Sequence, residues 1–234
     1  EYKNNILKNI LKLSELNIPI NPTFNQTKEL IYNDSELILR GILLNKDDIY
    51  VGCDIIISYR LFKKIFPKIN NLPFHLYCKG INDYLLIDIC YSTLHFNIDL
   101  KDVNNDNMIF YKKCSMYAFQ QVFYELSGNK SKCFLLGKEY YYKNTLLPKK
   151  EFIAQIDMND KIKNAYQNSL EWIKYLRKNH TKLYIDPKPN RIELFPNMNY
   201  HETEWENEKN KLASKIKELT LVWNISYEER CNLY

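Results

Sequence analysis

Residues 84–91 read Tyr-Leu-Leu-Ile-Asp-Ile-Cys-Tyr, an apolar run that contains a single charged residue, Asp88. A run of this length and composition predicts a buried β-strand. Because an isolated carboxylate is costly to remove from water, Asp88 must have a partner inside the protein. We expect that partner to be a metal ion, a lysine or arginine, or a set of backbone N–H donors.

A second acidic residue interrupts another predicted strand in the same way. Residues 51–57 read Val-Gly-Cys-Asp-Ile-Ile-Ile, with Asp54 at the centre. On neighbouring strands, Asp54 and Asp88 could share one divalent cation; the alternative is an acid paired with a basic residue. Because side chains alternate along a strand, we expect Asp88 and Cys90 to project from the same face.

The remaining sequence predicts an α/β fold, with a central mixed sheet flanked by helices. Apolar spacing and turn residues predict helices at 4–16, 59–66, 108–126, 160–178 and 205–218, strands at 37–44, 49–58, 74–78, 83–92, 132–137, 140–142 and 151–157, and a loop at 17–33. We expect a single domain over 1–234, with an N-terminal helix and loop at 1–35, a core at 36–157 and a C-terminal helical part at 158–234. Because a new helix begins close to residue 234, we also expect a fragment of a longer polypeptide.

Composition excludes several classes of protein and leaves the partner open. The 234 residues are 45% hydrophobic, enough for a full core, and contain no run of about 18 apolar residues that would span a membrane. The six cysteines lack the close spacing of metal knuckles or redox sites, which favours reduced, buried thiols. A net charge of +5 is compatible with a polyanionic partner but too mild to establish one.

Basic residues gather in one part of the sequence. The lysines of this segment are Lys130, Lys132, Lys138, Lys143, Lys149 and Lys150. A solvated surface is the simplest interpretation of such a cluster, and a contact with nucleic acid is the other.

Several blocks of sequence carry a resemblance to a known family. Residues 88–94 read Asp-Ile-Cys-Tyr-Ser-Thr-Leu and resemble the Asp-Ile-Lys-Tyr-Thr-Thr-Leu strand of RecB-like nucleases of the PD-(D/E)XK superfamily, of the kind encoded by large eukaryotic DNA viruses. Residues 52–57 are similar to the Gly-x-x-Asp-Leu strand of that family, and residues 133–138 to its Ala-Tyr-Leu-Leu-Gly-Arg strand. Further landmarks match at 169–177, 193–198 and 218–224. No block is specific by itself, but their order and spacing agree over residues 37–230.

The resemblance implies a restriction-endonuclease-like core with additional C-terminal helices. It also implies that Asp54 and Asp88 bind Mg²⁺ or Mn²⁺, that DNA is the partner, and that the location is intracellular, in the virion or the viral replication compartment. In such a site the metal polarises the scissile phosphate and lowers the pKa of the attacking water, while a lysine stabilises the transition state.

The chain departs from the family pattern at most of its functional positions. The family lysine falls on Cys90, its histidine falls near Leu44, and the glutamine and tyrosine of the following helix fall near Cys114 and Ala118. None of these side chains can replace the lost ammonium charge or amide. Removal of a single electrostatic donor typically costs about 10²- to 10³-fold in rate.

We therefore expect a catalytically impaired or inactive nuclease-fold module that binds DNA or serves as a scaffold, with no metal if the site is dead. The alternative is an active Mg²⁺- or Mn²⁺-dependent deoxyribonuclease in which Lys113, or its neighbour Lys112, replaces the missing lysine. Gln120 and Tyr124 could likewise restore a Gln-x-x-x-Tyr spacing further along the same helix. A purely protein-binding structural module, with other proteins or further domains of the chain as partners, is the third class.

Overall fold

The computed structural model describes residues 20–69, 83–98, 100, 102–104, 107–148, 151–201, 204–222 and 225–233. The predicted helix at 4–16 and the predicted strand at 74–78 lie outside these ranges. The chain forms two compact units, Glu1–Leu170 and Glu171–Tyr234. The division falls inside helix α5 (Asp160–Asn179), later than the expected start of the C-terminal part at 158.

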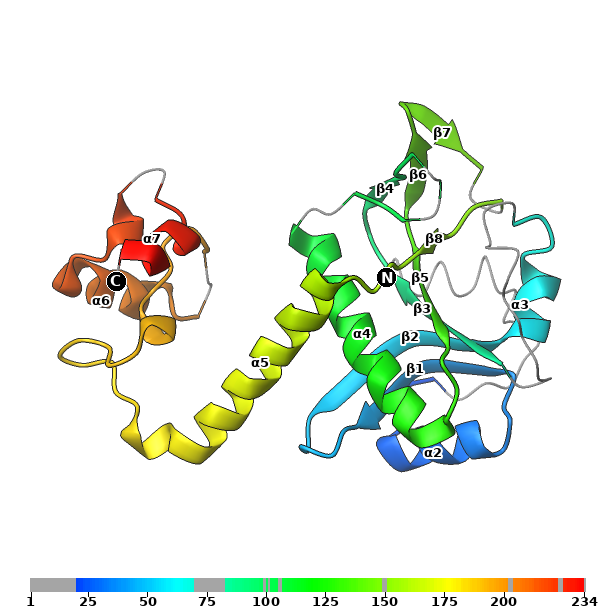
Figure 1. The fold of residues 1–234 in the computed structure, drawn as a ribbon, viewed down its shortest axis with the longest axis horizontal. Coiled ribbons are helices and arrows are strands. Elements are labelled where there is room, and N and C mark those ends of the chain that lie inside the picture. Colours follow the sequence, from blue (N-terminus) through cyan, green and yellow to red (C-terminus); the bar gives the residue numbers. More distant parts are fainter. Residues whose placement is uncertain are drawn as a thin grey trace. The chain divides into compact units, whose positions relative to one another are not determined.

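The first unit is built on a mixed five-stranded sheet, which confirms the expected α/β class (Figure 1). Its order is β1 (Leu37–Leu44), β2 (Tyr50–Ser58), β3 (Tyr84–Ile89), β5 (Lys132–Leu136) and β8 (Ala154–Gln155). The first three strands are antiparallel neighbours, β5 runs parallel to β3, and β8 is antiparallel to β5. A smaller sheet contains β4 (Thr93–His95), β6 (Glu139–Tyr142) and β7 (Thr145–Leu147).

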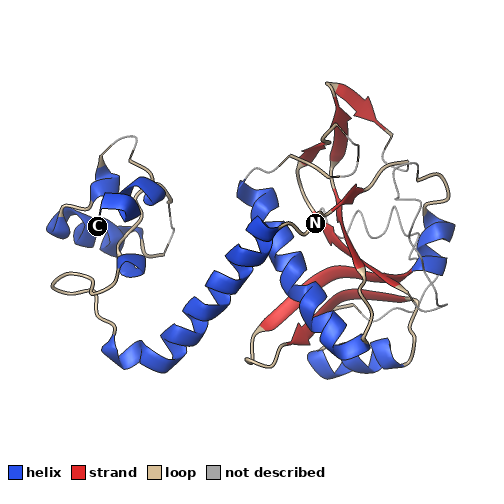
Figure 2. Cartoon of the chain, viewed as in Figure 1, coloured by secondary structure: helices blue, strands red, loops and turns tan. Residues whose placement is uncertain are grey.

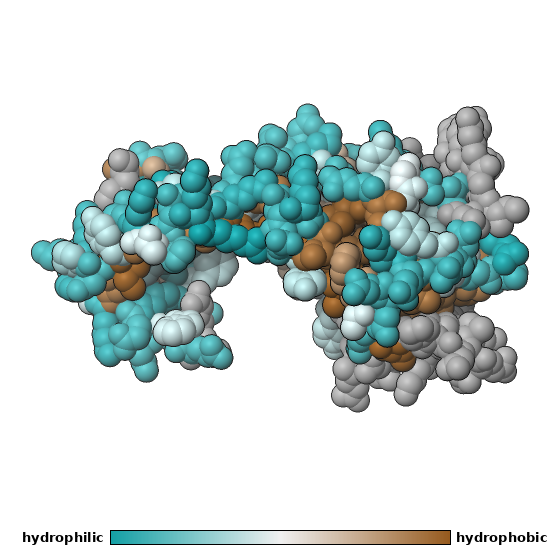
Figure 3. Space-filling model, turned by 90° about the horizontal axis from the view of Figure 1, so that it is seen from below, coloured by the Kyte–Doolittle hydropathy of each residue, from teal (hydrophilic) through white to brown (hydrophobic). Residues whose placement is uncertain are grey.

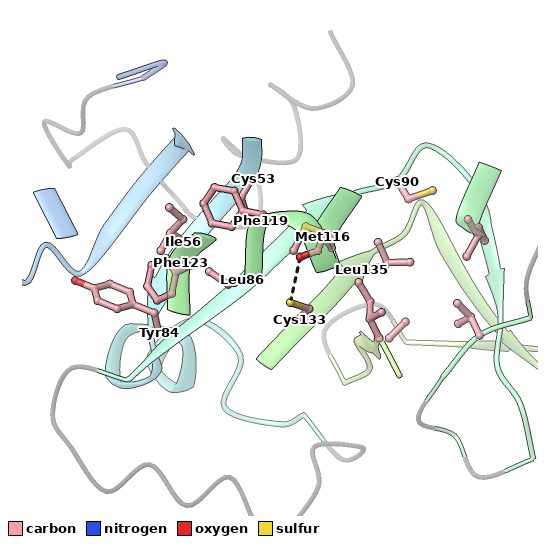
Figure 4. Close-up of a cluster of buried hydrophobic side chains, with 14 of the residues drawn as sticks. Cys53, Ile56, Tyr84, Leu86, Cys90, Met116, Phe119, Phe123, Cys133 and Leu135 are labelled. Carbon is pink, nitrogen blue, oxygen red and sulfur yellow. Dashed lines mark hydrogen bonds between the residues drawn. The ribbon is translucent and has the colours of Figure 1, made fainter. Parts of the chain in front are cut away.

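Helices pack on both faces of the main sheet, and Figure 2 draws them in blue beside its red strands. Helix α4 (Asn107–Ser127) provides the crossover between the parallel strands β3 and β5. Its Phe119 and Phe123 belong to the same buried cluster as Leu86 and Cys90 (Figure 4). The opposite face packs Leu85, Ile87 and Ile89 in one cluster with Phe62 of helix α3 (Tyr59–Ile65). Burial of both faces explains why β3 reads as a continuous apolar run.

The predicted loop at 17–33 is wrong over most of its length, because helix α2 occupies Phe24–Tyr32. Thr23 and Gln26 form a capping box at its start: Thr23 N donates to Gln26 Oε1 at 2.9 Å, and Gln26 N donates to Thr23 Oγ1 at 3.4 Å. Buried Thr27 and Ile31 anchor the helix. A Cβ on Gly41 of β1 would lie 3.1 Å from Thr27 Cγ2 and 2.8 Å from Ile56 Cδ1, so a glycine permits this close packing.

The predicted strand at 151–157 is also largely wrong, since only Ala154–Gln155 pair with β5. The second unit is helical over its described residues. It contains the end of α5, the 3₁₀ turns η2 (His180–Lys182), η3 (Ile192–Leu194) and η4 (Leu219–Leu221), and helices α6 (Glu206–Ile216) and α7 (Tyr227–Leu233). Arg230 of α7 is fully buried there and ion-paired with Glu218 at 3.1 Å between Nη1 and Oε1.

The surface drawn in Figure 3 is mostly hydrophilic, with apolar residues visible in limited areas. Among the described residues, no helix is both long enough and apolar enough to cross a membrane.

Candidate functional site

The two acidic residues predicted from the sequence meet on adjacent strands. In the β2–β3 ladder Ile55 pairs with Ile87, so the next position places Asp54 opposite Asp88. Residues opposite each other in a ladder project from the same face, and here that face is covered by α4. Asp54 is 8% exposed, and its Oδ2 accepts a hydrogen bond from the Ile89 backbone N–H at 2.9 Å.

A lysine from helix α4 reaches the acid pair. Lys112 Nζ lies 2.5 Å from Asp88 Oδ2, and the two side chains are 24% and 13% exposed. A charge-assisted hydrogen bond of this kind is stronger than one between neutral groups, and both side chains are largely buried. Of the partners expected for Asp88, the structure therefore provides a basic residue, while Asp54 receives a backbone donor.

The protonation of this cluster is set by burial. Burial raises the pKa of Asp88 to about 7, the contacting Asp54 carboxyl adds to this increase, and Lys112 opposes it. Burial lowers the pKa of Lys112, but the Asp88 carboxylate more than compensates, and the net direction is upward. Two buried acids in contact resist simultaneous ionisation, so Asp88 titrates near neutral pH while Lys112 stays charged.

The acid pair and Lys112 line a cavity of about 820 Å³. Met108, Tyr111, Lys112 and Ser115 contribute the wall formed by α4. The β1–β2 hairpin contributes Arg40, Gly41, Ile42, Gly52, Cys53 and Asp54, and Asn21 completes the lining on that side.

Arg40 is a cavity residue that sequence reasoning missed. Its backbone has φ 53°, a left-handed conformation that is uncommon for a long side chain. The β1–β2 register pairs Leu39 with Ile55 and Gly41 with Cys53, so the distortion falls opposite Asp54. Arg40 Nη1 donates to Asn21 Oδ1 at 3.2 Å. The sequence could have pointed to Arg40, because it is a charged residue inside the apolar run 37–44, the same pattern that indicated Asp54 and Asp88.

The structure does not bring Lys113 to the acids, and the lysine at this position is Lys112. Lys113 is fully buried, and its Nζ lies 2.7 Å from Asp102 Oδ1 and 3.1 Å from the Val103 carbonyl oxygen. Adjacent residues of a helix point about 100° apart, so only one of the two lysines can face Asp88.

Cys90, which the resemblance aligns with a catalytic lysine, is fully buried and does not line the cavity. Figure 4 places it in the apolar cluster with Cys53 and Leu135. Gln120, which could restore the expected glutamine, does not line the cavity, and its Nε2 donates to the Ser131 carbonyl oxygen at 2.6 Å. The cavity lining likewise lacks Tyr124 and the positions 44, 114 and 118.

Part of the donor set suits a hard divalent cation. Mg²⁺ is commonly held by one or two carboxylates together with water and substrate phosphates, which Asp54 and Asp88 could supply. Within the described ranges, no group of three or more His, Cys, Asp or Glu side chains could hold a metal ion. The Lys112 ammonium also lies against an Asp88 oxygen that the cation would need.

Neither a scan against protein-family models nor a search of curated proteins finds a significant match to this chain.

Proposed function

We propose that this chain is a RecB-like nuclease-fold module that binds DNA at the Asp54–Asp88 cavity and cleaves it poorly or not at all. The observation that carries the proposal is the contact of 2.5 Å between Lys112 Nζ and Asp88 Oδ2. An ammonium group in this position provides a positive charge for a phosphate and competes with a metal ion for the same carboxylate.

The charge balance of the cavity supports DNA binding. Arg40 and Lys112 contribute two cationic groups to its lining. When the acid pair retains one proton, it contributes one negative charge, and the cavity is net positive. The pKa of about 7 for Asp88 makes that form common at neutral pH. A concave site with net positive charge attracts a phosphate backbone.

The same contact supports weak catalysis. If Mg²⁺ or Mn²⁺ were bound, it would polarise the scissile phosphate and generate a nucleophile from water. Before a metal ion could bind, Lys112 would have to move away from Asp88, and the acid pair would have to lose its proton. The buried Cys90 cannot provide the fixed charge that stabilises the transition state.

The test combines DNA binding with DNA cleavage. The protein is incubated with labelled single-stranded and double-stranded DNA in Mn²⁺, and binding is measured by anisotropy over a range of salt concentrations. We expect binding that weakens with salt, because phosphate contacts release counterions, and no cleavage above the level of Asp88→Ala. Efficient cleavage that Asp88→Ala abolishes would contradict impaired catalysis, and absence of salt-sensitive binding would contradict the DNA-binding role.

An active Mg²⁺- or Mn²⁺-dependent deoxyribonuclease is the second candidate, and the position of Lys112 favours it. Two carboxylates and one ammonium in a single cavity are the chemical groups that metal-dependent phosphodiester cleavage requires. Lys112→Gln separates the candidates because they predict opposite effects. If Lys112 is catalytic, the substitution lowers the cleavage rate by about 10²-fold or more. If Lys112 blocks the metal position, the substitution leaves cleavage unchanged or increases it.

A further inference from the structure

The cavity lies beside an exposed lysine and tyrosine at the carboxyl ends of two parallel strands. Ile89 of β3 pairs with Leu136 of β5, and just beyond these residues the Cys90 N–H donates to the Leu136 carbonyl oxygen at 2.9 Å. Tyr91 follows β3 and Lys138 follows β5. Crevices outside the carboxyl ends of parallel strands are common ligand sites in α/β proteins.

Tyr91 and Lys138 form a ring–ammonium pair. Lys138 Nζ lies 5.4 Å from the centroid of the Tyr91 ring. Tyr91 remains 65% exposed, and Lys138 is also exposed. The Lys138 backbone N–H donates to the Ser92 carbonyl oxygen at 2.9 Å, which holds the two chain segments together. The pair therefore presents an aromatic surface and a positive charge side by side on a supported backbone.

One residue connects this pair to the cavity. Ser92, next to Tyr91, donates through its Oγ to Met108 Sδ at 3.9 Å. Met108 belongs to the cavity wall with Tyr111 and Lys112. Met108 and Ser92 therefore join the cavity wall to the chain segment that carries Tyr91.

We propose that Tyr91 and Lys138 bind the DNA segment next to the one in the cavity, with Lys138 on a backbone phosphate and Tyr91 against an unpaired base. This inference rests on the proposed DNA-binding function and assigns a role to one lysine of the basic cluster at 130–150. A base reaches the ring only where it is not paired in a duplex. The tyrosine therefore favours single-stranded segments, whereas the lysine acts on both forms.

The chain offers a matched control pair at the opposite end of α4. Lys130 Nζ lies 5.8 Å from the centroid of the Tyr124 ring, and Tyr124 is 42% exposed. Lys130 precedes the amino end of β5, whereas Lys138 follows its carboxyl end. The two pairs have the same chemistry and charge, and only the Tyr91–Lys138 pair lies at the cavity end of the sheet.

The experiment measures anisotropy of labelled single-stranded and duplex DNA in EDTA, for the wild type, Lys138→Gln, Tyr91→Ala, Lys130→Gln and Tyr124→Ala. Circular dichroism verifies that each variant is folded. We expect Lys138→Gln to weaken binding of both DNA forms and to reduce the salt slope by about one. Tyr91→Ala should weaken single-strand binding roughly ten-fold and change duplex binding little. The Lys130 and Tyr124 variants should bind like the wild type.

The outcomes distinguish this inference from the proposed function. If the wild type binds neither DNA form, the proposed function fails and the inference falls with it. The inference alone is overturned if the wild type binds DNA and the Lys138→Gln and Tyr91→Ala variants bind it as tightly as the wild type does. The same holds if these two variants lose no more affinity than the Lys130→Gln and Tyr124→Ala controls. If Tyr91→Ala weakens both DNA forms to the same degree, the assignment of Tyr91 to an unpaired base is overturned.

Discussion

Asp88 gives the protein a pH dependence of stability whose sign follows from its raised pKa. An aspartate has a pKa of about 3.9 in an unfolded chain, and burial raises that of Asp88 to about 7. The folded protein therefore binds a proton that the unfolded chain releases between these values. The stabilising contribution is complete below the lower pKa and is lost as the pH rises through about 7.

Asp88→Asn removes this titration and retains the shape of the side chain. We expect the variant to gain stability relative to the wild type as the pH rises from 5 to 8, by about 2 kcal/mol. Urea unfolding of both proteins at the two pH values measures the difference. Parallel pH dependences of the two proteins would show that Asp88 is not the titrating group.

At the scale of single residues, the sequence predicted the two acids and their need for partners, but not which partners they have. A charged residue in an apolar run can be recognised from the sequence, because its burial without a partner would carry a large desolvation cost. Asp54 and Asp88 are two such residues. The choice between Lys112 and Lys113 depends on the rotation of α4 about its axis. That rotation is fixed by the packing of Phe119 and Phe123 on the sheet, which becomes visible only in three dimensions.

Substitutions of Arg40 in strand β1 test whether the left-handed backbone at this residue, opposite Asp54, is strained. A glycine adopts φ 53° without penalty, whereas an alanine keeps the steric cost of a left-handed backbone. Since both substitutions remove the same guanidinium, their difference isolates the backbone. We expect Arg40→Gly to be more stable than Arg40→Ala by about 1 kcal/mol in denaturant unfolding.

Both Arg40 variants should also bind DNA more weakly than the wild type, because each loses a positive charge from the cavity. An alanine variant as stable as the glycine variant would show that the backbone at residue 40 relaxes to an ordinary strand conformation.

At the scale of elements, long periodic segments were predictable and short ones were not. Strand β1 has the predicted bounds, and α4 differs from the predicted 108–126 by one residue at each end. Helix α2 was missed because Pro19, Pro22 and its polar residues suggested a loop, although the Thr23–Gln26 capping signal was present. Strands β4 and β7 have three residues each, too few for periodicity to reveal, and β4 also depends on a partner, β6, that is distant in the sequence.

The molecule consists of two compact units, and its tryptophans allow one of them to be followed separately. Trp172, Trp205 and Trp223 all belong to Glu171–Tyr234. In that unit the fully buried Arg230 contacts Glu218, and its Nη1 donates to the Pro196 carbonyl oxygen at 3.0 Å. Its guanidinium carbon also lies 4.5 Å from the centroid of the Tyr227 ring.

Arg230→Met should destabilise the second unit strongly, because it leaves the Glu218 carboxylate buried without its counter-charge. We expect a loss of about 3–5 kcal/mol in the unfolding followed by tryptophan fluorescence. The double variant Arg230→Met with Glu218→Gln removes both charges and should recover much of this loss. Equal destabilisation in the single and double variants would contradict the role of the buried charge.

We propose that the Lys112 ammonium occupies the place of a metal ion at the Asp54–Asp88 pair. The most direct measurement is Mn²⁺ affinity, determined by electron paramagnetic resonance of free Mn²⁺ for the wild type, Lys112→Gln and Asp88→Asn at neutral pH. We predict weak binding by the wild type, binding about ten-fold or more tighter in Lys112→Gln, and none in Asp88→Asn. Tight binding by the wild type that weakens in Lys112→Gln would contradict the claim and identify Lys112 as part of a functioning metal site.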